Sequence, residues 1–214
     1  MTTKLIQGPI ANLPTKYGLF NITIFKENDF LDHAVIFIGD LSNGEPVLCR
    51  IHSECLTGDV FGSLKCDCGF QLAAALEAIQ KEGRGALLYM RQEGRGIGLF
   101  NKIRAYKLQD NGADTVDANV QLGFPADARD YEACAQIMKN MGFTKVVLMT
   151  NNPAKIHDIE NHGIEVVGRR PIEYGRNTFN ENYLDTKCCL RCSNLTSGLS
   201  SKSQRKTFEI KSKV

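Results

Sequence analysis

The stretch FQLAAALEAIQKEGRGALLYM, residues 70–90, joins a helix to a strand through a short turn. Apolar residues recur at helical spacing in its first half, which predicts an amphipathic helix over 70–81 that ends at Gly83. The apolar run 84–90 that follows is typical of a short buried strand. A helix joined to a buried strand in this way predicts a sheet that is covered by helices.

The pattern on either side of this unit extends the prediction. Downstream, helices are expected over 97–110 and 130–141 and from the Asn152-Pro153 corner, with strands over 145–150 and 164–167. Upstream, the expected strands cover 17–26, 33–39 and 47–52, separated by Asn, Asp and Gly. We therefore expect an α/β (α+β) fold, a three-layer domain with a mixed, partly antiparallel sheet.

The composition excludes several classes of protein. Hydrophobic residues make up 43% of the 214 and charged residues 23%, which is ordinary for a globular domain with a sizeable core. The longest apolar runs, 34–38 and 86–90, are far shorter than the roughly 20 residues of a membrane-spanning helix. The first residues lack the apolar segment of a secretory signal, and eight cysteines are too few for a disulfide framework. We expect a cytoplasmic protein without a membrane partner.

The charge is unevenly distributed. Residues 187–214 contain seven Lys or Arg and one acid, Glu209, so they carry +6, and with a total of +2 the first 186 residues carry −4. A nucleic-acid-binding domain would more often have a basic folded face, so the balance favours a small-molecule substrate and no nucleic acid. Periodicity ends at Cys188, which predicts a domain over 1–187 and a basic, flexible tail over 188–214. The tail's Cys188, Cys189 and Cys192 could hold a second metal, although an unstructured extension is favoured.

Three cysteines form the sharpest chemical pattern. Cys55, Cys66 and Cys68 lie within fourteen residues of a polar, Gly-containing segment, which predicts a zinc site with three thiolate ligands and an open position for water. Bound zinc lowers the pKa of such a water to about 7, so the site would be catalytic. The alternative is three unrelated buried thiols. Core packing is the better interpretation for Cys49 and Cys134, which fall in an apolar strand and an amphipathic helix.

Other polar loops are candidate anion sites. The turn RQEGRGIG, 91–98, lies between a strand and a helix, and its glycines and arginines suit a phosphate, although an ordinary turn would look similar. Thr150 and Lys155 follow an expected strand, where ligands gather in open α/β sheets. Asp127 and Arg129 lie in the loop GFPADARDY, and spacing alone would leave them as surface residues.

Taken together, the ordered motifs resemble a known family. RIHSECLTGD, KCDCGFQL, RQEGRGIGL with NKIRAY, DANVQLGFPADARDY, LMTNNPAK and ENYLDTK are similar to GTP cyclohydrolase II over residues 13–187. The resemblance implies hydrolysis of GTP to formate, pyrophosphate and 2,5-diamino-6-(ribosylamino)pyrimidin-4-one 5′-phosphate, the first step of riboflavin biosynthesis. It also implies zinc on the three cysteines, Mg²⁺ with the triphosphate, and a homodimer.

The resemblance assigns roles residue by residue. Arg129 would be the nucleophile toward the α-phosphate, Asp127 the proton acceptor, and Tyr106 a neighbour of the reacting base. A guanidinium stays protonated at neutral pH, so a purely electrostatic role for Arg129 is the alternative. The positions matched to GTP contacts are Arg50, Ile51, His52, Ser53, Glu54, Gln71, Glu93, Gly94, Arg95, Thr115, Thr150 and Lys155.

Two other functions compete with the complete reaction. A paralogue of the family would open the imidazole ring but retain the formyl group, giving a formamidopyrimidine; in such proteins the tyrosine beside the base is replaced, so Tyr106 argues for the complete reaction. A zinc-stabilised nucleic-acid or regulatory binding protein would close its metal site with a fourth protein ligand. The acidic body and the three-cysteine motif argue against it.

Overall fold

A computed structural model describes residues 5–111, 118, 120–125, 129–181 and 184. Within these residues the strands form one eight-stranded sheet in the order β1-β3-β4-β6-β5-β7-β8, with β2 paired to β3. The strands are β1 (Ile6–Gln7), β2 (Ala11–Thr15), β3 (Gly18–Lys26), β4 (Asp32–Ile38), β5 (Val47–Ser53), β6 (Gly85–Met90), β7 (Lys145–Met149) and β8 (Glu165–Arg170).

The sheet has an antiparallel half and a parallel half. Strands β1 to β4 pair antiparallel, and β4 joins β6 antiparallel. Strands β6, β5, β7 and β8 then run parallel to one another. The central strand β5 is buried along almost its whole length, as expected for a parallel strand with helices on both faces.

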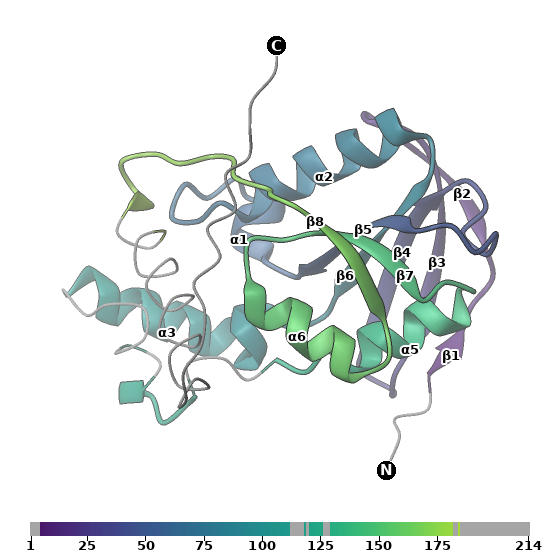
Figure 1. The fold of residues 1–214 in the computed structure, drawn as a ribbon. Helices are drawn as coiled ribbons and strands as arrows, with labels where there is room; N and C mark the ends of the chain where they lie inside the picture. Colours follow the sequence, from purple (N-terminus) through teal and green to yellow (C-terminus); the bar gives the residue numbers. More distant parts are fainter. Residues whose placement is uncertain (1–4, 112–117, 119, 126–128, 182–183, 185–214) are drawn as a thin grey trace, which may run out of the picture.

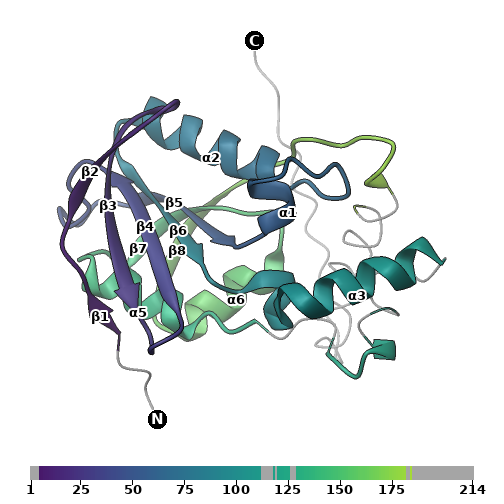
Figure 2. The ribbon, with the colours of Figure 1, turned by 180° about the vertical axis from the view of Figure 1, so that it is seen from behind.

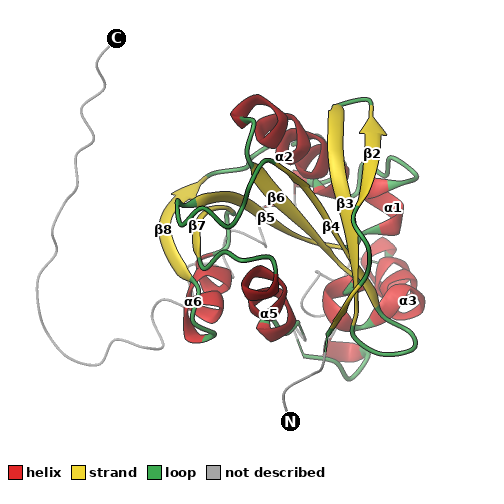
Figure 3. Ribbon diagram, turned by 90° about the vertical axis from the view of Figure 1, so that its right-hand side faces the viewer, coloured by secondary structure: helices red, strands yellow, loops and turns green. Residues whose placement is uncertain are grey.

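Helices cover both faces of the sheet. They are α1 (Leu56–Asp59), α2 (Cys68–Glu82), the short turn η1 (Glu93–Gly96), α3 (Gly98–Asp110), α5 (Glu132–Asn140) and α6 (Pro153–Asn161). Figure 3 shows α2 on one face and α5 and α6 on the other, with α1 and α3 beyond one end of the sheet (Figures 1 and 2). The core is divided accordingly: Ala75 and Ile79 of α2 pack with Leu48 and Leu87, whereas α5 and α6 pack over the opposite face of β5.

The expected three-layer α/β fold with a mixed sheet is confirmed. Helix α2 ends at Gly83, which adopts the left-handed conformation (φ 72°), and α6 begins after Asn152, whose side chain accepts a hydrogen bond from Ala154 N. Cys49 and Cys134 are fully buried core residues, as expected. The prediction missed β1 and β2, which are short and largely exposed and therefore have no alternating apolar pattern. The expected domain boundary at residue 187 lies outside the described residues.

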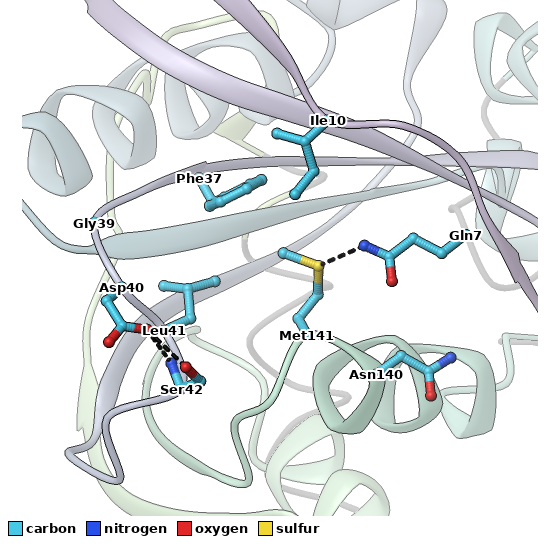
Figure 4. A pocket seen from close by; sticks show the side chains of 9 residues that line it. All are labelled: Gln7, Ile10, Phe37, Gly39, Asp40, Leu41, Ser42, Asn140 and Met141. Carbon is cyan, nitrogen blue, oxygen red and sulfur yellow. Dashed lines mark hydrogen bonds between the residues drawn. The ribbon is translucent and has the colours of Figure 1, made fainter.

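The topology separates two edges of the sheet. The carboxyl ends of β5, β6 and β7 meet at one edge, and the end of the antiparallel β4 lies at the other. A pocket of about 280 Å³ lies at that second edge. Gln7 Nε2 donates there to Met141 Sδ at 3.6 Å, and Figure 4 shows the two side chains pointing toward each other. None of the residues that line the pocket is a candidate site residue. No described helix has the length and apolar character to cross a membrane.

Candidate active site

The ends of three adjacent parallel strands bring the predicted motifs together. Ser53 ends β5, Arg91 follows β6 and Thr150 follows β7, and these strands are neighbours in the order β6-β5-β7. The carboxyl edge of a parallel sheet is where ligands bind in open α/β folds. Motifs that are about a hundred residues apart in sequence therefore share one edge.

The three cysteine sulfurs form a compact cluster beside this edge. Cys55 precedes α1, Cys66 lies in the following loop and Cys68 begins α2; their Sγ atoms lie within 4.8 Å of one another, and those of Cys55 and Cys66 are 3.6 Å apart. Thiolates at about 2.3 Å from a tetrahedral zinc lie about 3.8 Å apart, so the sulfurs fit this metal. The cysteines are free, and among the described residues no other His, Cys, Asp or Glu joins the cluster.

Two glycines make the cluster possible. A Cβ on Gly58 would lie 2.8 Å from Cys66 Sγ and 3.1 Å from Cys55 Sγ. A Cβ on Gly69 would collide with the carbonyl oxygen of Gly58. The helices α1 and α2 can therefore approach closely enough for the three sulfurs to meet only because both positions lack a side chain.

The electrostatics of the cluster favour a thiolate at Cys55. Hydrogen bonds from Cys66 and Cys68, followed by the nearby Lys102 ammonium, lower the pKa of Cys55 far below its ordinary value. Lys102 Nζ lies 3.1 Å from Cys55 Sγ and 2.8 Å from Glu93 Oε1. Because metals bind the thiolate form, this environment prepares Cys55 as a ligand.

The glycine-rich motif forms a tight left-handed turn. Gly94 and Arg95 have φ values of 62° and 61°, and the conformation at Arg95 is uncommon for a residue with a side chain. The Glu93 carboxylate holds the turn, since Oε1 accepts from Gly94 N at 2.9 Å and Oε2 from Leu56 N at 2.7 Å. Glu93 thus ties the turn after β6 to the segment that carries Cys55.

Arg50 and Gln71 form a buried relay to the cysteine loop. Arg50 donates to the Met149 carbonyl at 2.8 Å and to Gln71 Oε1 at 2.6 Å, and Gln71 Nε2 donates to Asp67 Oδ2 at 2.5 Å. Asp67 lies between Cys66 and Cys68 in sequence and is itself buried. Arg50 and Gln71 therefore link the end of β7 to the cysteine loop, whatever they contribute to substrate binding.

Cationic side chains gather at the ends of β5 and β7. Arg129 Nη1 lies 3.4 Å from Ser53 Oγ, and the Arg129 guanidinium lies 5.8 Å from the centre of the Tyr131 ring. Lys155 is 5% exposed, donates to the Ile51 carbonyl at 3.0 Å, and lies 5.2 Å from the same ring. The side chain of Ile51 packs in the core, so this residue offers only its backbone to a ligand.

Tyr106 lies next to the cysteine cluster. Its hydroxyl is 3.3 Å from Thr57 Oγ1, which is 3.7 Å from Cys55 Sγ. Burial raises the pKa of Tyr106 to about 12, so the hydroxyl is protonated at neutral pH and can donate a hydrogen bond. The tyrosine of the NKIRAY motif therefore presents a donor hydroxyl beside the cysteine cluster.

Some of the remaining predicted site residues lie in the part of the chain that the structure describes, and two lie outside it. Glu54 Oε2 pairs with Arg91 Nε at 2.9 Å, His52 is buried against Asp59, and the Thr150 hydroxyl accepts from Asn152 N. Thr115 and Asp127 lie outside the described residues. Substrate contact by the matched residues stays a prediction.

Sequence reasoning missed Asp59, Lys102 and Tyr131. Lys102 precedes Tyr106 by four residues on one helix, a spacing that places both on one face and could have identified it. Asp59 and Tyr131 gave no such signal. Cys55 and His52 lie before the start of α1, and Arg129 lies before the start of α5, so no pattern within a single helix or strand joins them to Asp59 or Tyr131. Tyr89 and Lys155 are distant in sequence.

Comparison with known proteins identifies the family. Residues 7–171 match the family model described as GTP cyclohydrolase II. GTP cyclohydrolase-2 of Haemophilus influenzae (strain PittEE) is 59% identical over 182 residues, which cover 83% of each chain. The GTP cyclohydrolase-2 of Aeromonas hydrophila subsp. hydrophila is 60% identical over 178 residues, covering 83% of this chain and 90% of that protein. A family model that spans most of the chain and relatives at this level of identity show that the chain belongs to the GTP cyclohydrolase II family.

Proposed function

We propose that this protein carries out the complete GTP cyclohydrolase II reaction, with a zinc ion on Cys55, Cys66 and Cys68 and GTP along the carboxyl edge of β5, β6 and β7. As a member of its family the protein is a GTP cyclohydrolase II, the enzyme of the first step of riboflavin biosynthesis. The observation that carries the proposal is the convergence of the cysteine cluster, Tyr106 and Arg129 at one edge of the sheet.

The cysteine cluster would hold the metal. Three soft sulfur donors within 4.8 Å of one another, one of them prepared as a thiolate, suit zinc. When bound, zinc supplies Lewis-acid chemistry and an activated water for attack at an electrophilic carbon. In this protein Lys102 adds a positive charge at Cys55 Sγ, and the Arg50–Gln71–Asp67 relay holds the loop that carries the other two ligands.

Tyr106 would act on the purine base. Its protonated hydroxyl, held near Thr57, can donate a hydrogen bond to charge that develops on the base when the imidazole ring opens. A chain that stopped at the formamidopyrimidine would lack this group, so its presence favours release of formate.

The cations at the ends of β5 and β7 would bind the phosphates. Arg129 and Lys155, with the hydroxyls of Ser53 and Thr150, offer donors suited to phosphate oxygens, and Mg²⁺ would accompany the triphosphate. The family resemblance gives Arg129 the role of nucleophile at the α-phosphate, which would release pyrophosphate and leave a GMP group bound to the arginine nitrogen. A protonated guanidinium suits charge stabilisation there equally well, and trapping of a covalent guanylyl-enzyme distinguishes the two roles.

We also propose the wider setting of the enzyme. Exposed apolar side chains on α3, including Phe100 (78% exposed) and Ile103 (48%), support a homodimer. The free thiols of the described cysteines support a cytoplasmic enzyme. Residues 1–187 would form the catalytic domain and 188–214 a basic tail.

Measurement of formate, pyrophosphate and GMP from GTP tests whether the cysteine cluster is needed for formate release and Arg129 for pyrophosphate release. Cys66→Ser is expected to lose zinc and formate release while retaining part of pyrophosphate release, so that GMP accumulates. Arg129→Ala is expected to suppress pyrophosphate release severely. Cys134→Ala, which removes a buried cysteine of α5 that is not part of the cluster, should retain zinc and all products. A zinc-free Cys66→Ser protein that makes formate at the parent rate would overturn the catalytic assignment of the cluster.

A further inference from the structure

The carboxylate of Asp59 accepts hydrogen bonds from three groups: two side chains on neighbouring strands and one backbone N–H. It accepts from His52 Nε2 of β5 at 3.0 Å, from the Tyr89 hydroxyl of β6 at 2.8 Å, and from the backbone N–H of Cys55 at 3.0 Å. Its side chain is only 3% exposed. A buried carboxylate with this many donors is held rigidly, and so are the groups that donate to it.

The protonation of its partners follows from their surroundings. Burial, followed by the charge of Asp59, raises the pKa of Tyr89 above its ordinary value, so this hydroxyl remains a donor. Burial lowers the pKa of His52, which favours the neutral ring, although Asp59 opposes the effect. A neutral imidazole that donates from Nε2 to a carboxylate has its lone pair on Nδ1.

His52 Nδ1 is therefore an acceptor without a partner in the described part of the chain. The atom is buried, and no hydrogen bond from a described residue reaches it. The ring is fixed by stacking on Tyr89, with centroids 5.4 Å apart and planes inclined by 21°. His52 lies on the same face of β5 as Arg50, which bonds to α2, so the ring lies on the side of the sheet that carries the cysteine cluster.

We propose that Asp59 is a positioning residue with two tasks: it holds the backbone of Cys55 in the metal cluster, and it fixes His52 so that Nδ1 accepts a hydrogen bond from an N–H or O–H group of the nucleotide substrate. The first task rests on the proposed zinc site. The second rests only on the hydrogen-bond network and on GTP as the substrate.

Two substitutions separate the tasks. Asp59 Oδ2 accepts from both Cys55 N and Tyr89, so the amide oxygen of Asp59→Asn can keep both contacts. His52 Nε2 lies 3.0 Å from the same Oδ2 and 3.1 Å from Oδ1. In Asp59→Asn the amide NH₂ takes the place of Oδ1, and this donor favours the ring tautomer that accepts at Nε2 and carries its hydrogen on Nδ1. Asp59→Asn is therefore expected to change the tautomer of His52 while it keeps the contact with Cys55 N. Asp59→Ala removes all three contacts, including the contact with Cys55 N.

Three measurements test the proposal: zinc affinity by competition with a chelator, the absorption spectrum of the Co²⁺-loaded protein, and the ¹⁵N chemical shifts of the histidine ring. Asp59→Asn should bind zinc as the parent does, give the parent Co²⁺ spectrum, show the Nδ1–H tautomer at His52, and lose about 10- to 100-fold in kcat/KM for GTP. Asp59→Ala should bind zinc about 10- to 100-fold more weakly with a changed Co²⁺ spectrum.

The controls distinguish failure of this proposal from failure of the zinc site. Asp29→Asn, at an exposed pair with Lys26, should match the parent in every measurement. If the parent and Cys66→Ser bind zinc equally, the proposed metal site is wrong. If Cys66→Ser loses zinc but Asp59→Ala binds it like the parent, Asp59 does not hold Cys55. If Asp59→Asn inverts the tautomer and keeps the parent kcat/KM, His52 Nδ1 does not serve the substrate.

Discussion

Gly58→Ala tests whether the three sulfurs must meet at one point. The added Cβ would lie 2.8 Å from Cys66 Sγ, whereas ordinary contacts begin at 3.4 Å, so Cys66 Sγ must move by about 0.6 Å. Zinc–ligand distances tolerate only about 0.2 Å. We expect zinc affinity to fall about 10- to 100-fold, which corresponds to roughly 1.4–2.7 kcal/mol. The metal-free protein should also lose stability, because the added Cβ makes the same close contacts with Cys66 and Cys55 when zinc is absent, but the zinc-loaded protein should lose more.

The assay is competition for zinc with a chromogenic chelator, alongside thermal unfolding with and without EDTA. Gly168→Ala is the matched control, because a Cβ at Gly168 meets only the Val147 methyl groups, at 3.8 Å. It should leave zinc affinity unchanged. A folded Gly58→Ala protein that binds zinc as tightly as the parent would refute the steric argument and the cluster geometry with it.

Three further predictions concern the base, the core and the tail. Tyr106→Phe removes one hydroxyl and keeps the ring, so steady-state kinetics with GTP should show kcat lowered about 100-fold and KM changed little; unchanged kcat would make Tyr106 a packing residue. Burial raises the pKa of Cys134 to about 12, so in the folded protein the thiol stays protonated at pH values where the unfolded chain ionises it. The contribution of Cys134 to the free energy of unfolding should therefore be constant below about pH 9 and fall as the pH rises toward 12. Urea unfolding between pH 8 and 11 should show that the free energy of unfolding falls less steeply with pH in Cys134→Ala than in the parent. Equal slopes in the two proteins would show that Cys134 does not cause the alkaline loss of stability. Truncation after Lys187 should retain GTP turnover within about twofold, because every matched site residue lies at or before Lys155; a folded, truncated enzyme with greatly reduced turnover would assign part of the site to the tail.

The sequence alone determined the elements whose signals are local. Helix α2 follows from apolar spacing and a terminal glycine, and α6 from an asparagine cap before proline, because these signals act between residues a few positions apart. The cysteine spacing likewise identified the candidate metal site, since soft ligands close in sequence have few other uses in a polar loop. Strands β1 and β2 escaped prediction because their side chains are mostly exposed.

Tertiary structure decided how these pieces make a site. The neighbour order β6-β5-β7 brings Arg91, Ser53 and Thr150 to one edge, and strand order depends on packing of the whole domain. Lys155 bonds to a carbonyl 104 residues away and Arg50 to one 99 residues away, so both cations could be recognised as candidates but not placed. Asp59 was not singled out in the sequence, and only the fold turned its carboxylate toward His52, Tyr89 and the backbone N–H of Cys55. Local sequence patterns predict where helices and strands end and which face of each is buried. The partners of a buried polar group depend on contacts between separate elements, and these form only when the layers of the domain pack together.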